Sequence, residues 1–178
     1  EPATQALLVQ PATAIVDFTG SPRFGSWLEH NCPGKLVYTE TAGCNSVVLE
    51  STHDLEATTR AIAHSLCQAS AQMCTSVQNI HIPADGVRVG SSRATYEQVS
   101  EAVCAAVEYW LADERRAATL CGTLFDDAVQ HTVDRYRELA GDRVLRDSAA
   151  YAIDGFAKAR TATPLVIAAD ETDRDWYR

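Results

Sequence analysis

The chain is predicted to be an α/β protein, a three-layer α/β/α sandwich with a largely parallel or mixed sheet. Two patterns predict this class, namely apolar runs of strand length and the helical segments that alternate with them. Short apolar runs of strand length alternate with longer segments whose apolar residues recur at helical spacing. The chain has 178 residues and is 46% hydrophobic, so it is also long enough to bury a substantial core without disulfide or metal staples.

The N-terminal part of the chain is expected to contain strands and one short helix. The helix places Phe24, Trp27 and Leu28 at helical spacing and is ended by Pro33 and Gly34. Strands are expected where short apolar runs meet turn-forming residues, at 14–18, 35–39 and 46–49. The connection between the last two strands contains a glycine, and function is often located in such connections.

The remaining helices are predicted from apolar spacing and from capping residues. Ser51 or Thr52 can cap the first of them, and Thr95 with Gln98 forms a capping-box signature. Asp126 can cap the last helix, which Gly141 would end. The expected helices are at 52–70, from 95 to about 110, at 113–120 and from 126 to about 140. Further strands are expected at 77–82, 144–145 and 164–167.

Charge and composition exclude several classes of partner. There are 24 acidic and 15 basic residues, a net charge of -9, and no basic run, which argues against binding to nucleic acid or to an anionic membrane. No apolar stretch reaches the length of a membrane span, and no signal peptide is recognisable, so a cytoplasmic location is expected. No C-x-x-C pair occurs, so neither disulfides nor a metal site are expected.

Six thiols compete for the role of a nucleophile, and they differ in local setting. Cys67 and Cys104 lie inside predicted helices, where a cysteine is usually a small buried apolar residue. Cys32 and Cys121 adjoin Pro or Gly and are interpreted as loop residues. Cys74 is mildly favoured, because it lies in a polar connection between a predicted helix and a strand. The sixth, Cys44, lies in the earlier candidate loop.

Glu40 is the most unusual carboxylate, because it ends an apolar strand instead of lying on a solvated helix face. A solvent-facing loop acid is one interpretation of this position. A general base is the other, since a partly dry cavity would raise the pKa of the carboxyl group toward neutrality. Neither a phosphate-binding loop nor a G-x-G-x-x-G dinucleotide motif is present.

Three segments, taken together, resemble motifs of the aldehyde dehydrogenase superfamily. Phe18-Thr19-Gly20-Ser21 resembles its F-T-G-S turn, Glu40-Thr41-Ala42-Gly43 its E-L-G-G motif, and Ala71-Gln72-Met73-Cys74 its G-Q-x-C motif. The order is that of the family, and so is the separation of Glu40 and Cys74, which is 74 minus 40, or 34 residues. The surrounding sequence resembles the phenylacetic acid degradation branch.

The resemblance implies a reaction and its residues. Cys74 would attack an aldehyde to give a thiohemiacetal, whose oxyanion the backbone N–H of Cys74 would partly hold. Hydride would pass to NAD or NADP, and Glu40 would activate water to hydrolyse the resulting thioester. The residues expected along the dinucleotide are Thr19, Gly20, Ser21 and Thr41.

The resemblance also implies how the chain is organised. Residues 1–33 would be the tail end of a cofactor-binding domain, and residues 34–178 a catalytic domain that is incomplete at its C-terminus. The chain would then be a fragment of a homo-oligomeric enzyme of aromatic acid degradation that oxidises a small aldehyde, and it would be inactive in isolation.

An alternative is a catalytically silent α/β scaffold or self-association domain. Ala42 and Ala71 replace glycines that are common in the family motifs, and each methyl group could shift its loop. A hydrolytic cysteine enzyme is a third possibility, which the lack of a suitably placed histidine disfavours.

Overall fold

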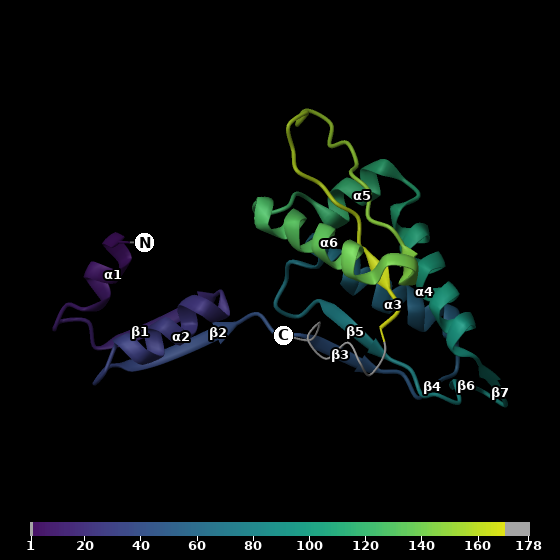
Figure 1. Cartoon of the computed structure of the whole chain (residues 1–178), viewed down its shortest axis with the longest axis horizontal. Coiled ribbons are helices and arrows are strands. Elements are labelled where there is room, and N and C mark those ends of the chain that lie inside the picture. Colours follow the sequence, from purple (N-terminus) through teal and green to yellow (C-terminus); the bar gives the residue numbers. More distant parts are fainter. Residues whose placement is uncertain (1, 170–178) are drawn as a thin grey trace. The chain divides into compact units, whose positions relative to one another are not determined.

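The computed structural model describes residues 2–169 (Figure 1). The chain divides into two compact units, residues 1–43 and 44–178, which are described separately below. The division expected after residue 33 falls inside the first unit, between a helix, Pro22–Asn31, and a strand, Leu36–Thr41.

The first unit is a parallel pair of strands with a helix packed against it. Its elements are α1 (Pro2–Leu8), β1 (Ile15–Gly20), α2 (Pro22–Asn31) and β2 (Leu36–Thr41). Val16, Leu28 and Cys32 form its buried core. Cys32 lies just after α2, in the connection to β2 where the sequence places it, and it is only 3% exposed. The helix α1 was not expected from the sequence, because its seven residues carry no capping signal.

A glycine sets the distance between α2 and β2. Gly25 is buried on α2, and a Cβ added there would lie 2.8 Å from the Cγ2 atom of Thr41. No real Cβ approaches another carbon so closely. The absence of a side chain at Gly25 therefore allows α2 to lie directly on the end of β2.

The second unit contains three small sheets in its described part. β3 (Asn45–Val48) and β5 (Val77–His81) pair in parallel, and β8 (Val144–Arg146) pairs antiparallel with β9 (Val166–Ile167). The third is mixed and is built from β4 (Ser51–Thr52), β6 (Val87–Val89) and β7 (Ser92–Ala94). The last three strands were not expected, because two or three residues are too few to show an alternating pattern.

The helices of the second unit begin at acidic or hydroxyl caps. They are α3 (Leu55–Cys67), α4 (Tyr96–Leu111), α5 (Glu114–Cys121) and α6 (Asp127–Ala140). The capping box of Thr95 and Gln98 is confirmed, since both of its hydrogen bonds are present. The cap expected for α3 is wrong, because Asp54 accepts the bond from the N–H of Ala57 while Thr52 lies in β4.

Helices α3 and α4 lie side by side and cover the strands of the second unit (Figure 1). One core cluster joins Leu49 and Val87 to Ile62 of α3 and Val99 of α4. None of the helices between residues 2 and 169 has the length and apolar character that a membrane span requires. The α/β class with parallel and mixed strand pairing is thus confirmed.

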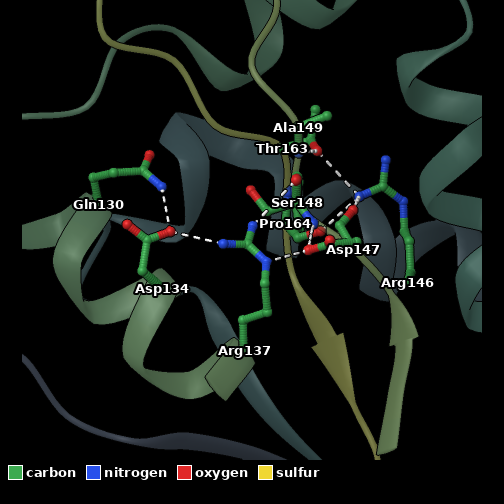
Figure 2. A network of polar contacts seen from close by, with 9 residues as sticks. All are labelled: Gln130, Asp134, Arg137, Arg146, Asp147, Ser148, Ala149, Thr163 and Pro164. Atoms are coloured by element: carbon green, nitrogen blue, oxygen red, sulfur yellow. Dashed lines mark hydrogen bonds and ion pairs between the residues drawn. The ribbon is translucent and has the colours of Figure 1, made fainter. Parts of the chain in front are cut away.

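Arg146 joins the last part of the chain to α4. Its side chain is only 11% exposed and its Nε atom donates to Glu108 at 2.7 Å. Its Nη1 atom donates to the hydroxyl of Thr163 and to the carbonyl oxygens of Asp147 and Pro164 (Figure 2). One largely buried cation thus satisfies acceptors from three different segments.

Arg137 of α6 extends this network (Figure 2). Its guanidinium group donates to Asp134, to Asp147 and to the carbonyl oxygen of Ser148. The hydrogen bond from Arg137 lowers the pKa of Asp147. The contact therefore contributes its full stabilisation at pH values above the ordinary pKa of an aspartate. This stabilisation is lost as the pH falls through the lowered pKa of Asp147 in the folded state.

Replacing Arg146 with methionine is expected to destabilise the protein by about 2–4 kcal/mol, because several hydrogen bonds to a charged group are lost and buried acceptors stay unpaired. Urea unfolding measures this change. The matched control is Arg160→Met, which removes a half-exposed arginine that pairs with Asp127 and is expected to cost at most about 1 kcal/mol. Equal losses in the two variants would contradict the structural role of Arg146.

Candidate active site

The residues expected to contact a dinucleotide lie at one edge of the first unit. In the parallel register, Thr19 of β1 is opposite Glu40 of β2, and Gly20 is opposite Thr41. Ser21 follows directly and caps α2. Ligands of open α/β sheets bind outside the carboxyl ends of parallel strands, and these five residues lie at such an edge.

The end of β1 offers main chain rather than side chain to a ligand. A Cβ on Gly20 would lie 2.6 Å from the Cζ atom of Phe18, so a side chain at this position would require the Phe18 ring to move. The Oγ atom of Ser21 accepts a hydrogen bond from the N–H of Phe24 at 3.3 Å, which leaves the hydroxyl proton of Ser21 available to an acceptor. A strand end followed by a helix N-terminus can bind anionic groups such as phosphates through main-chain N–H groups.

Glu40 lies one residue before the end of β2 and is exposed within its unit. Its carboxylate has no hydrogen bond or ion pair to any of residues 2–169. The nearby hydroxyl of Thr39 donates to Glu29 instead, at 2.6 Å. Glu40 is therefore a free carboxylate that can accept a proton.

Cys74 lies in a tight turn between α3 and β5, in the connection where the sequence places it. The N–H of Ser76 donates to the carbonyl oxygen of Met73 at 3.0 Å, which closes a turn with Cys74 at its second position. The Cys74 side chain is exposed. A thiol presented in this way is accessible to a small electrophile.

The segment before this turn, the 3₁₀ helix η1 (Gln68–Ala71), has an unusual backbone. Ala69, Ser70 and Ala71 have φ angles of 52°, 53° and 58°, in the left-handed region that favours glycine. Such a conformation costs about 1–2 kcal/mol per residue. The methyl group of Ala71, where the family motif has glycine, is therefore accommodated in a strained backbone.

Side chains hold this strained segment in place. The hydroxyl of Ser70 donates to the carbonyl oxygens of Cys121 and Ala162, which are 3.2 and 3.3 Å away. Gln72 donates to the carbonyl oxygens of Ala69 and Thr123 at 2.8 and 2.9 Å. These bonds fix the direction from which the chain enters the Cys74 turn.

Sequence reasoning missed one residue of this region, Asn45. Its side-chain amide donates to the carbonyl oxygen of Cys74 at 2.5 Å and to that of Ser76 at 3.1 Å. The sequence shows Asn45 only as the neighbour of Cys44. No local pattern indicates a contact with a residue that follows 29 positions later.

The six thiols differ sharply in their exposure to solvent. Cys44 and Cys74 are exposed, whereas Cys67 and Cys121 are 0% and 1% exposed. The loop interpretation of Cys121 is wrong, because this residue belongs to α5. The hydrogen bond with Cys121, together with burial, raises the pKa of the Cys67 thiol. Burial also raises the pKa of Cys104. No group of three or more possible metal ligands occurs among residues 2–169.

Labelling of the native protein with iodoacetamide is expected to modify Cys44 and Cys74 first. The buried Cys32, Cys67 and Cys121 should react at least about 100-fold more slowly, because they need an opening of the structure. Mass spectrometry of peptides measures the rates, and labelling in urea is the control in which all six thiols react. Fast native labelling of Cys121 would contradict the structure.

The fold and these residues define a class of protein: an α/β protein that presents an exposed cysteine thiol on a turn and, at the carboxyl edge of a parallel strand pair, a carboxylate unpaired among residues 2–169. Comparison with protein families identifies it further. Residues 1–176 match the model of the aldehyde dehydrogenase family, and the chain belongs to that family. The resemblance noted in the sequence is thus confirmed at the level of the family.

Solved structures agree with this assignment. An NAD-dependent aldehyde dehydrogenase from Burkholderia multivorans is 39% identical, with a TM-score of 0.91, over 99% of this chain and 31% of that one. The Mycobacterium tuberculosis aldehyde dehydrogenase complexed with NAD+ is 19% identical, with a TM-score of 0.70, over 95% of this chain and 34% of that one.

A third similar structure is a mutant of aldehyde dehydrogenase C from Pseudomonas syringae in complex with NAD+ and octanal. It is 16% identical, with a TM-score of 0.70, over 92% of this chain and 33% of that one. At such identities the last two structures show the fold alone. The chain spans about a third of the length of these relatives. No curated protein matches the chain.

Proposed function

We propose that this chain is part of an NAD-dependent aldehyde dehydrogenase and supplies its nucleophile, Cys74, and its general base, Glu40. The observation that carries the proposal is the exposed Cys74 thiol on a turn inside the family motif. The choice of NAD is supported by the relative from Burkholderia multivorans, which is described as NAD-dependent.

The turn accounts for the first step, attack of the Cys74 sulfur on the aldehyde carbon. The carbonyl oxygen of Met73 accepts the hydrogen bond that closes the turn, and in a trans peptide the N–H of Cys74 points the opposite way. This N–H finds no acceptor among residues 2–169. It is thus available to donate to the oxyanion that forms when sulfur bonds to carbon.

Glu40 accounts for the last step. NAD, when bound, would supply a hydride acceptor. Loss of hydride from the thiohemiacetal carbon then leaves a thioester on Cys74. Glu40 then removes a proton from water, the water oxygen bonds to the thioester carbon, and the Cys74 sulfur leaves. The free and exposed carboxylate of Glu40 supports this role, because no cation competes for it among the described residues.

The end of β1 and the adjacent end of β2 would hold the dinucleotide. Gly20 allows close approach of the main chain, and the hydroxyl of Ser21 keeps a free proton at the start of α2. Thr19 and Thr41 lie beside them in the parallel register. Their role is to bind and orient the cofactor.

The finer assignments rest on the sequence. The sequence around the three motifs supports an aldehyde of phenylacetic or other aromatic acid degradation as the substrate. A homo-oligomer and a cytoplasmic location stay predictions from the sequence. Since relatives are about three times as long, we assign turnover to a longer protein and none to this chain alone. Residues 1–33 would complete a cofactor domain and residues 34–178 would begin the catalytic one.

A test is NADH formation by the complete protein with NAD and a panel of aromatic and aliphatic aldehydes. Turnover is expected, with a preference for the aromatic aldehydes. The second candidate, a silent scaffold, is favoured by one observation, the strained Ala71 in place of a motif glycine. A scaffold would form no NADH, and its Cys74 would react with iodoacetamide no faster than Cys44.

A further inference from the structure

Asn45 is the first residue of β3, and it contacts the turn that carries Cys74. Both N–H bonds of its side-chain amide are used, one to the carbonyl oxygen of Cys74 at 2.5 Å and one to that of Ser76 at 3.1 Å. Both contacts lie within the second unit. The mechanism above does not use this residue.

The contact fills a gap in the strand pairing. Asn45 is opposite Val77, but the next pair of residues is Ser46 and Asn79, so the register shifts by one residue at this point. A shift of this kind disrupts the ladder locally. The Asn45 side chain takes up two carbonyl oxygens just before β5 begins, where regular backbone pairing is interrupted.

These two bonds restrict the orientation of Cys74. The carbonyl oxygen of Cys74 belongs to the peptide plane between Cys74 and Thr75, so a bond to this oxygen restrains ψ of Cys74. The turn has one backbone hydrogen bond of its own, from the N–H of Ser76 to Met73. Among residues 2–169, Asn45 is the side chain that donates a hydrogen bond to the carbonyl oxygen of Cys74, whereas Gln72 holds the chain before the turn.

We infer that Asn45 is a positioning residue for the nucleophile: its amide fixes the turn, and with it the directions of the Cys74 sulfur and N–H. This inference rests on the proposed function. A neutral double donor is required, because a carboxylate at the same place would face two carbonyl oxygens. A displacement of the reacting atom by about 1 Å can lower a rate about 100-fold.

The test compares Asn45→Asp and Asn45→Ala with Asn79→Asp in the complete protein. Asn79 is half-buried on the paired strand β5, and its side chain makes no hydrogen bond to residues 2–169, so this control makes the same chemical change nearby. One measurement is the rate of the NADH burst in a single turnover. The other is hydrogen exchange of the Ser76 amide, which needs no activity.

Both Asn45 variants are expected to slow the burst about 100-fold, with KM for NAD unchanged, and to speed exchange at Ser76 about tenfold. Asn79→Asp is expected to change neither. A wild-type burst rate in the Asn45 variants, an unchanged exchange rate, or an equal effect of Asn79→Asp would overturn the inference. Absence of a burst in the wild type would instead overturn the proposed function, while exchange would still measure the contact.

Discussion

Replacing Cys74 with alanine in the complete protein is expected to abolish NADH formation from aldehyde and NAD, with a loss of at least about 10⁴-fold in turnover. Without the sulfur no thiohemiacetal forms, and the hydride has no tetrahedral carbon from which to leave. The methyl group fits where an exposed thiol was, so folding should be unaffected. Absorbance of NADH measures the rate.

The matched control is Cys44→Ala, which removes the other exposed thiol from a position outside the turn. It is expected to keep most of the activity. Binding of NAD to the Cys74 variant should also persist, since its cofactor residues lie in the first unit. Turnover that survives in Cys74→Ala would overturn the assignment of the nucleophile.

Replacing Glu40 with glutamine is expected to separate the two halves of the reaction. The first hydride transfer should proceed, and the thioester should then accumulate, because a neutral amide cannot take the proton from water. A stoichiometric burst of NADH is expected, followed by a steady-state rate lowered by about 10²–10⁴-fold. Rapid mixing measures the burst, and mass spectrometry of the acylated protein identifies the thioester on Cys74.

Glu29→Gln is the control for this change. Glu29 is an exposed carboxylate of the same unit, and it accepts a hydrogen bond from Thr39 instead of standing free. Its replacement should leave both burst and turnover in place. Loss of the burst itself in Glu40→Gln, or full turnover without Glu40, would show that this carboxylate is not the base for hydrolysis.

Elements whose ends carry their own capping chemistry could be predicted from the sequence. The helix α4 is an example, because Thr95 and Gln98 satisfy its first N–H groups locally. The strands β4, β6 and β7 could not be predicted, since their partners lie far apart along the chain and each strand has only two or three residues. The start of α3 was misplaced because Thr52, a good cap, is used by a strand and Asp54 caps instead.

The candidate site likewise contains some features that local sequence patterns predict and others that they do not. The positions of Glu40 at a strand end and of Cys74 in a connection follow from local patterns, so the sequence predicts them. The contact of Asn45 with the Cys74 turn and the burial of Cys121 depend on tertiary packing, which leaves no local signal. A glycine next to Cys121 indicated a loop, although the thiol lies in the core beside Cys67.

The left-handed run from Ala69 to Ala71 limits which amino acids this loop can accept. Branching at Cβ makes that backbone region most unfavourable, so valine, isoleucine and threonine should be poorly tolerated at these positions. Glycine and asparagine should be well tolerated at Ala69 and Ala71, whereas Ser70 is also needed for its hydrogen bonds to Cys121 and Ala162. The repertoire of sequences that can present this nucleophile is therefore restricted by backbone shape a few residues before the sulfur, as well as by the reaction.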